Sequence, residues 1–232
     1  MPTWDELFQQ EKHRWPDPHQ MVVDFARALL QRGVEQVLDL GCGAGRHTVY
    51  LTQMGFTVFA TDLSEIGLSV TRSRLCAEGG SADLYLADMS STALADSSID
   101  AVICLYVIYH AKLERVRHAV AEIERVLRPG GIALVTLIST RGYRYGRGRE
   151  IEPDTFLPDT GPDTSLPHHF FDNEGSRDLL RRFDVASLFL DENIEESDDG
   201  RQLLHSHWVG IVEKVSKSHT DATLVDWGQR KA

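Results

Sequence analysis

VLDLGCGAG, from Val37 to Gly45, is the stretch of this sequence that decides its fold. It begins with a short apolar run that is typical of a strand buried on both faces of a parallel sheet. Three glycines follow at alternate positions, and glycine lets a ligand approach the main chain closely. Residues 46–55, RHTVYLTQMG, then show the apolar spacing of a helix. A strand, a glycine loop and a helix in this order predict a nucleotide-like binding site at the start of the helix.

Two residues of this stretch discriminate between ligands. The dinucleotide fingerprint is G-x-G-x-x-G, but the third glycine falls one residue early, so Arg46 stands in its place. Asp39 stands just before the loop, where a carboxylate would repel a pyrophosphate but attract an ammonium group, directly or through water. S-adenosylmethionine carries an ammonium group and no phosphate. The loop therefore favours S-adenosylmethionine, and a nicotinamide-dependent dehydrogenase becomes the weakest of the alternatives.

At this point the sequence resembles the class I S-adenosylmethionine-dependent methyltransferases of the small-molecule type (methyltransferase domains 11 and 25), whose first motif is an acidic residue followed by G-x-G-x-G. The block from Val37 to Thr140 matches this family in order and spacing, including Leu-Arg-Pro-Gly-Gly at 127–131 before an apolar strand. A glycine turn in an unrelated α/β protein would not explain that order. The resemblance implies a Rossmann-like α/β fold: a seven-stranded, mostly parallel sheet with an antiparallel last strand and helices on both faces.

The resemblance also implies which residues contact the cofactor. Asp62 ends a predicted strand about twenty residues after the first glycine, the spacing at which a carboxylate meets the adenosine ribose; capping of the next helix is the alternative. Asp88 ends the following strand and is implied to receive the adenine amino group, with Met89 against the ring; a surface turn is the alternative. The predicted cofactor-binding residues are Asp39, Gly41, Cys42, Gly43, Gly45, Asp62, Leu63, Asp88, Met89 and Leu105.

Candidate acceptor-side residues follow the fourth predicted strand and end a later insertion. The strand at 99–105 ends at the topological switch point, where ligands of open α/β sheets bind. The insertion at 141–171 is basic and glycine-rich, then proline-rich, with little regular pattern, and such connections are usually functional or mobile. In the family this position forms an acceptor-side cap; a stiffened surface loop with partly solvated histidines is the alternative. The candidate catalytic residues are Tyr109, His110, His168 and His169.

Composition limits the function classes. The chain has 232 residues, enough for one sizeable α/β domain, and a net charge of −11 from 24 basic and 35 acidic residues. An acidic chain lacks the broad basic face that nucleic-acid binding needs, so we expect no nucleic-acid partner. Three cysteines without paired or metal-ligand spacing predict reduced thiols in a cytoplasmic protein. No apolar run is long enough to span a membrane, so we expect no membrane association.

The remaining segments complete the predicted organisation. Asp17 and Pro18 predict the start of a helix that ends at Gly33. The acidic segment 192–200, ENIEESDDG, predicts a solvated loop between the last two strands. His205 and His207 share one face of the last strand, but a third ligand with clear spacing is missing, so we predict no metal site. The predicted organisation is a single methyltransferase domain over 1–216, with N-terminal helices or lid at 1–33 (Trp4 and Trp15 as candidate lid residues), a cap loop at 141–171 and a polar tail at 217–232.

Methyl transfer from S-adenosylmethionine to a small-molecule acceptor, by in-line displacement, is the function that the sequence predicts. Because the sulfonium methyl group is already activated, proximity is the leading catalytic contribution, and a base is needed only for a protonated acceptor. A methyltransferase acting on a protein or RNA, or a non-catalytic S-adenosylmethionine-binding protein, is the alternative. We expect a monomer or a homodimer.

Overall fold

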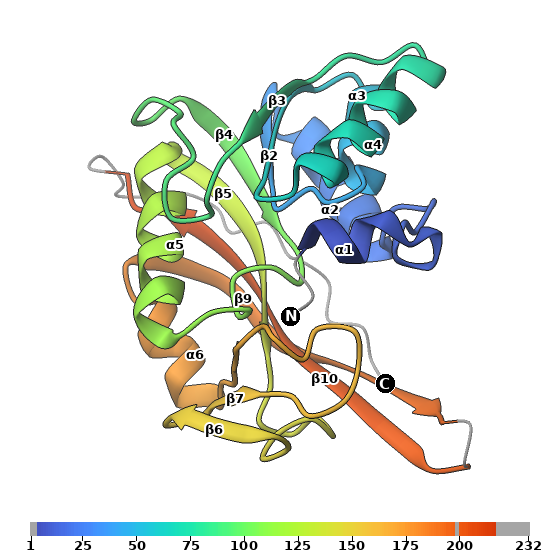
Figure 1. Ribbon diagram of the computed structural model, residues 1–232. Coiled ribbons are helices and arrows are strands. Elements are labelled where there is room, and N and C mark those ends of the chain that lie inside the picture. Colours follow the sequence, from blue (N-terminus) through green and yellow to red (C-terminus); the bar gives the residue numbers. More distant parts are fainter. Residues whose placement is uncertain (1–3, 198–199, 217–232) are drawn as a thin grey trace.

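A seven-stranded sheet organises the protein (Figure 1). The computed structural model describes residues 4–197 and 200–216, so the predicted tail at 217–232 lies outside the described residues. The strands of the sheet are β1 (Gln36–Leu40), β2 (Thr57–Asp62), β3 (Asp83–Leu86), β4 (Ile99–Cys104), β5 (Leu127–Ile138), β9 (Phe183–Glu196) and β10 (Gln202–Lys214). Their order is β3-β2-β1-β4-β5-β10-β9.

The pairing of the strands creates one switch point. Strand β1 pairs in parallel with β2 on one side and with β4 on the other, so the strand order reverses there. A crevice at the carboxyl ends of β1 and β4 follows from this reversal, because successive connections leave on opposite sides. Strand β10 lies antiparallel to both β5 and β9. The predicted fold class, including the antiparallel last strand, is confirmed.

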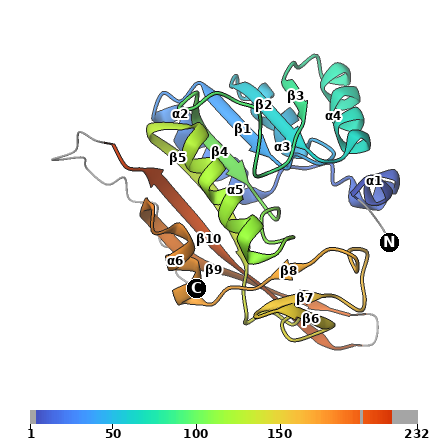
Figure 2. The ribbon, with the colours of Figure 1, turned by 60° about the vertical axis from the view of Figure 1, so that its left-hand side comes forward.

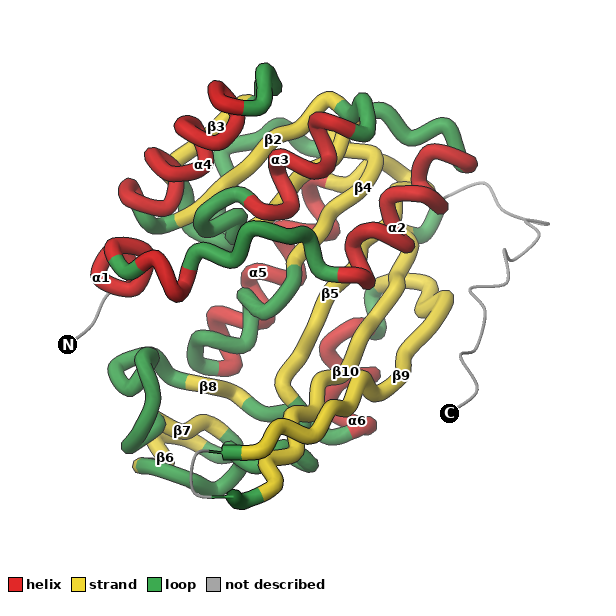
Figure 3. Tube along the Cα trace, turned by 90° about the vertical axis from the view of Figure 1, so that its right-hand side faces the viewer, coloured by secondary structure: helices red, strands yellow, loops and turns green. Residues whose placement is uncertain are grey.

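Helices cover both faces of the sheet (Figure 3). One face is covered by α2 (Gln20–Gln31), α3 (Arg46–Gln53) and α4 (Glu65–Ala77), the other by α5 (Leu113–Val126) and α6 (Asn173–Leu180). The apolar residues of α2 and α5 recur at helical spacing, which gives each helix one buried stripe. The central strands are buried on both sides because of this cover, as the continuous apolar run of β1 predicts. Within the described residues, no helix combines the length and apolarity needed to cross a membrane.

The N-terminal segment packs against the mouth of the crevice. It forms helix α1 (Trp4–Gln9) and a 3-10 turn (Glu11–His13). The Asp5 carboxylate accepts hydrogen bonds from the Ser64 hydroxyl and the Ile66 amide, at the start of α4. A carboxylate at a helix start is favourable because it satisfies free amides and meets the positive end of the helix dipole. Charge complementarity therefore docks α1 on α4.

Helix α2 begins later than Asp17 and Pro18 predict. It starts at Gln20, and His19 is the residue before it; Nδ1 of His19 accepts the Met21 amide at 3.2 Å. The His19 amide in turn donates to Nε2 of His47 on α3. The prediction from Asp17 was wrong because this long-range contact determines which residue caps the helix.

The insertion at 141–171 contains more regular structure than its composition indicates. Strands β6 (Arg149–Glu152), β7 (Thr155–Leu157) and β8 (His168–His169) form a small antiparallel sheet (Figure 2). It lies beside the projecting end of β9 and β10. Phe156 and Phe170 pack into the main core and supply the apolar anchor that the small sheet lacks on its own. The predicted absence of regular pattern was wrong for this segment.

The predicted solvated loop at 192–200 is strand over residues 192–196. Strand β9 continues to Glu196, opposite Gln202 on β10. Its exposed acidic residues have partners on β10: Glu192 accepts a hydrogen bond from Ser206, and Glu195 meets His205 at 3.0 Å. Glu192 also accepts one from Arg141, in the segment after β5. Cross-strand pairs stabilise a hairpin without burial, so acidity here does not imply a loop.

Candidate active site

A cavity of about 1100 Å³ opens at the carboxyl ends of β1, β2 and β4, under helix α1. Most of the predicted cofactor residues line it; these are Gly41, Cys42, Gly43, Asp62, Leu63, Asp88, Met89 and Leu105. Tyr109 and His110 line the same cavity, as do the predicted lid residues Trp4 and Trp15. The structure therefore brings the predicted cofactor residues and part of the predicted acceptor side into one continuous space.

The glycine loop follows β1 and turns sharply into α3. Gly43 has a φ of +54°, a left-handed conformation that favours glycine. A Cβ atom on Gly43 would lie 2.7 Å from the Phe8 ring of α1, which is too close for a normal contact. Gly45, the N-cap of α3, lies against Thr71 rather than in the cavity lining. Gly43 therefore lets α1 approach the loop, and Gly45 lets the loop pack on α4.

Asp62 organises the loop at the end of β2. One of its carboxylate oxygens accepts the Gly43 amide at 2.7 Å, and the other accepts the Ser64 amide at 2.8 Å. Burial raises the pKa of this carboxyl group. Ser64 is the N-cap of α4, because its hydroxyl accepts the Gly67 amide. Asp62 is thus not the helix cap that the sequence left open, and it faces the cavity with unused lone pairs.

The other two predicted acids differ in exposure. Asp39 is 2% exposed, lies outside the cavity lining, and accepts the Thr48 hydroxyl at 2.7 Å. Burial raises its pKa to about 6. Asp88 lines the cavity, accepts the Ser90 amide at 2.8 Å and pairs with Arg115 of α5. Arg115 could not be predicted from the sequence, because helical periodicity alone does not show which turn of α5 reaches the cavity.

Aromatic side chains close the predicted acceptor end of the cavity. Tyr106 follows β4 with a φ of +60°, and its amide donates to the Thr136 hydroxyl at 2.6 Å. Its phenol oxygen lies 3.2 Å from Nε2 of His19. Trp4 meets the edge of His110 with ring centroids 5.1 Å apart. A strained residue held in this way at a ligand-binding edge is typical of a functional site.

Burial determines the protonation states of the titratable side chains at this end of the cavity. It lowers the pKa of His110 to about 3 and raises the pKa of Tyr106 to about 12. The pKa of Tyr109 is raised as well, since its ring is fully enclosed. Near neutral pH both phenols are therefore protonated hydrogen-bond donors, and the His110 ring is neutral.

The two histidines of β8 point in different directions. His168 lines a smaller cavity of about 170 Å³, which shares Tyr106, Tyr109 and His110 with the large one. His169 is absent from the described lining of both cavities. Its amide donates to the Tyr109 carbonyl at 2.9 Å, and its ring meets the Thr155 hydroxyl at 2.6 Å. His169 thus anchors the small sheet to the loop after β4, and its predicted catalytic role stays a prediction.

Two arginines hold the N-terminal segment over the cavity. The Arg74 guanidinium of α4 donates to the main-chain carbonyls of Arg14 and Trp15, at 2.7 and 3.0 Å. The Arg46 guanidinium lies over the Trp15 ring, 5.3 Å from its centroid. Both contacts join residues far apart in the sequence, so periodicity could not predict them. They support the predicted lid position of Trp15.

The combination of this sheet order, the glycine loop and the acid-ended strands defines the class I methyltransferase fold. Residues 38–135 match the family model of a methyltransferase domain. The chain is also similar in structure to a methyltransferase from Methanosarcina mazei described as S-adenosylmethionine-dependent, with a TM-score of 0.69 and 22% identity over 87% of this chain and 100% of the other. A 1,6-didemethyltoxoflavin N1-methyltransferase from Burkholderia thailandensis is similar with a TM-score of 0.63 and 19% identity, over 90% and 84% of the two chains. At these identities both neighbours show the fold.

The chain is also similar in sequence to named methyltransferases. The malonyl-[acyl-carrier protein] O-methyltransferase of Pectobacterium atrosepticum is 40% identical over 104 residues, which are 44% of this chain and 38% of the relative. A ubiquinone biosynthesis O-methyltransferase of Thiobacillus denitrificans is 30% identical over 149 residues, 60% of this chain and 63% of the relative. The matches thus span from a third to two thirds of these relatives' lengths. Together, the match over residues 38–135 and these partial matches support a class I S-adenosylmethionine-dependent methyltransferase family for this chain.

Proposed function

We propose that this protein binds S-adenosylmethionine and transfers the methyl group to a small-molecule acceptor. The observation that carries the proposal is the cavity that joins the glycine loop and the acids ending β2 and β3 to a chamber lined by Trp4, Tyr106 and Tyr109, which we call the aromatic chamber. A dinucleotide-binding loop would carry a glycine where this chain has Arg46, and the buried Asp39 just before the loop would repel a pyrophosphate. The two curated relatives named above are O-methyltransferases, which supports methyl transfer as the reaction class.

The residues present fit this cofactor. Gly41 and Gly43 line the cavity, and their missing side chains let Val107 and Phe8 pack against the main chain of the loop. Asp62 would hold the ribose, because its free lone pairs can accept hydroxyl hydrogen bonds. Asp88 and Met89 would hold the adenine, and the backbone of the glycine loop with Leu105 would hold the methionine portion. Leu63 is 48% exposed at the edge of the cavity and would cover the adenosine as it binds.

The residues of the chain would position the acceptor, whereas the methyl group is already activated in the cofactor. S-adenosylmethionine supplies an electrophilic methyl group, so the protein has to align the acceptor and exclude water. Trp4, Phe8 and Trp15 enclose the cavity from the N-terminal side. Tyr106 and Tyr109 would orient the acceptor by donating hydrogen bonds, since their raised pKa values keep both phenols protonated. His110 is a weak base near neutral pH, because a pKa of about 3 is poorly matched to proton abstraction.

Calorimetry and a transfer assay test this proposal. S-adenosylmethionine and its demethylated product should bind at one site, and NAD should not bind. Labelled methyl groups should pass from S-adenosylmethionine to a component of a metabolite pool. Asp62→Ala should weaken cofactor binding tenfold or more, because each hydrogen bond to a charged group contributes roughly 1.5–3 kcal/mol. Asp83→Ala, an exposed position on the neighbouring strand β3, is the matched control. NAD binding of comparable strength would overturn the proposal.

A further inference from the structure

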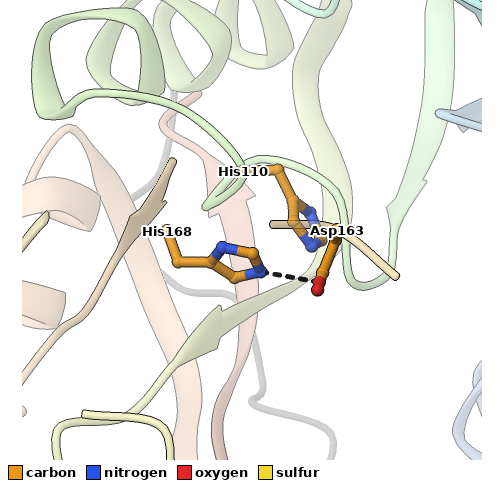
Figure 4. A group of neighbouring side chains, drawn as sticks. All are labelled: His110, Asp163 and His168. Carbon is orange, nitrogen blue, oxygen red and sulfur yellow. Dashed lines mark hydrogen bonds and ion pairs between the residues drawn. The ribbon is translucent and has the colours of Figure 1, made fainter. Parts of the chain in front are cut away.

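Three possible metal ligands meet beside the aromatic chamber (Figure 4). His110 follows β4, His168 lies on β8, and Asp163 lies in the loop before β8. Their ligand atoms all lie within 4.8 Å of one another. His168 is 1% exposed, and the Asp163 side chain is 13% exposed. These three residues, which we call the His-Asp-His cluster, are therefore largely shielded from bulk solvent.

Main-chain carbonyls determine how the two histidines present their ring nitrogens. Nδ1 of His110 lies 3.1 Å from the Val107 carbonyl oxygen, and Nδ1 of His168 lies 3.0 Å from that of Leu166. A carbonyl only accepts, so each Nδ1 carries the hydrogen. In a neutral ring the lone pair is then on Nε2. The same outer contact fixes the tautomer and orientation of most metal-ligating histidines.

Only one of the two carboxylate oxygens of Asp163 has hydrogen-bond partners among the described residues. Its Oδ2 atom lies 3.0 Å from Nε2 of His168 and accepts a hydrogen bond from Arg144 at 2.9 Å. Among the described residues, its buried Oδ1 atom has no hydrogen-bond partner. A buried acceptor without a partner costs free energy. Nη1 of Arg144 also lies 3.5 Å from Nε2 of His168, so the guanidinium faces the same side of the cluster, and the Oδ1 atom of Asp163 remains available to a further cation.

We propose that the His-Asp-His cluster binds one divalent transition-metal ion, for which zinc is the reference. Two imidazole nitrogens and one carboxylate suit zinc and iron better than magnesium or calcium. Arg144 would remain on Oδ2 of Asp163 as an outer partner, as ligating carboxylates commonly have. Ligand atoms on one zinc ion lie roughly 3.3 Å apart, as follows from bonds of about 2.0–2.1 Å. The separations of up to 4.8 Å therefore have to contract by at most about 1.5 Å.

Three protein ligands leave part of the coordination sphere open, which distinguishes a reactive site from a structural one. His110 lines the large cavity and His168 the small one, so the open side meets the chamber that both share. A methyl acceptor with a hydroxyl or carboxylate oxygen would bind the ion there; this consequence rests on the proposed function. The three ligands come from 110, 163 and 168, a spacing that matches no metal motif.

The experiment measures zinc binding to the full chain after removal of metal with a chelator. Titration calorimetry should show saturable binding with one strong site, and cobalt should give the visible spectrum of a coordinated ion. His110→Gln, Asp163→Asn and His168→Gln should each weaken zinc binding by more than about 100-fold, and Arg144→Gln by about 10–100-fold. His205→Gln is the matched control, since this histidine is 30% exposed, pairs with Glu195 and lies outside the cluster.

Two outcomes would overturn the proposal. Wild-type protein without saturable zinc binding would show that the His-Asp-His cluster is held by its own hydrogen bonds and holds no metal ion. Equal loss of binding in the control variant would show that zinc binds elsewhere. Circular dichroism and binding of S-adenosylhomocysteine establish that each variant is folded. Because the latter is independent of zinc, failure of cofactor binding in wild-type protein would contradict the proposed function alone.

Discussion

The two ends of the large cavity are constructed differently. At the predicted cofactor end, the glycine loop after β1 and the acids at the ends of β2 and β3 come from adjacent parallel strands. At the acceptor end, side chains from α1, the loop after β4 and the segment before β8 converge. The first end depends on backbone conformation, which short motifs determine. The second depends on contacts between distant segments, which can change without altering the fold.

Breaking the cofactor end should have the largest effect. Gly43→Val introduces a branched side chain at a φ of +54° and 2.7 Å from Phe8. S-adenosylmethionine binding should become undetectable in calorimetry, because both the loop and the lid residue have to move. The backbone strain alone costs about 1–2 kcal/mol of stability.

Gly79→Val is the matched control for that variant. Gly79 has a φ of +67°, and a Cβ there meets nothing within 4 Å. It should lose comparable stability in urea unfolding and keep cofactor affinity. Unchanged affinity in Gly43→Val, or equal losses of affinity in both variants, would contradict the assignment of the loop to the ligand.

Asp39 sharpens the comparison, because a buried acid lies beneath the cofactor end. Its pKa of about 6 lies above the roughly 3.9 of an unfolded chain, so the folded state holds the extra proton between these values. The contribution of Asp39 to the free energy of unfolding is therefore most favourable at low pH and falls as pH rises toward 6. Asp39→Asn should remove a penalty of about 3 kcal/mol at pH 7 and almost none at pH 4.

Urea unfolding of the wild type and of Asp39→Asn at pH 4.5 and 7 measures this difference. A variant that is less stable than wild type at pH 7 would show that the charge is compensated in the folded protein. Cofactor affinity, measured in parallel, should fall if the carboxylate attracts the ammonium group from beneath the loop, as the sequence predicts.

The lid connects the two ends, and weakening it should have the smallest effect. Arg74→Ala removes the guanidinium that holds the Arg14 and Trp15 carbonyls. Cofactor affinity should fall about threefold to tenfold, since part of the hydrogen-bond energy is recovered from water. Limited proteolysis near Trp15 should accelerate. Arg72→Ala, at an exposed position on the same helix, is the control and should change neither. A lid unaffected by Arg74→Ala would mean that its apolar contacts suffice.

Short-range signals were enough to predict most of the main domain. The strands around the glycine loop, the helices that separate them and the antiparallel last strand were predicted from local periodicity and from the family resemblance. Asp62 was placed correctly at the cavity for the same reason, since a residue that ends a parallel strand must lie at one edge of the sheet. The errors fall where long-range contacts decide: His19 in place of Asp17 as the cap of α2, and the hairpin that extends β9.

The sequence by itself determined the sheet and the glycine loop and predicted the class of ligand, because each depends on neighbouring residues and on backbone geometry. Tertiary structure alone decided which side chains share the acceptor end. His110, Asp163 and His168 come together only after the small sheet docks on the loop following β4. Arg144 reaches Asp163 by the same docking. No local sequence pattern predicts this cluster, because its residues lie on segments that are distant in the sequence and come together only in the folded protein.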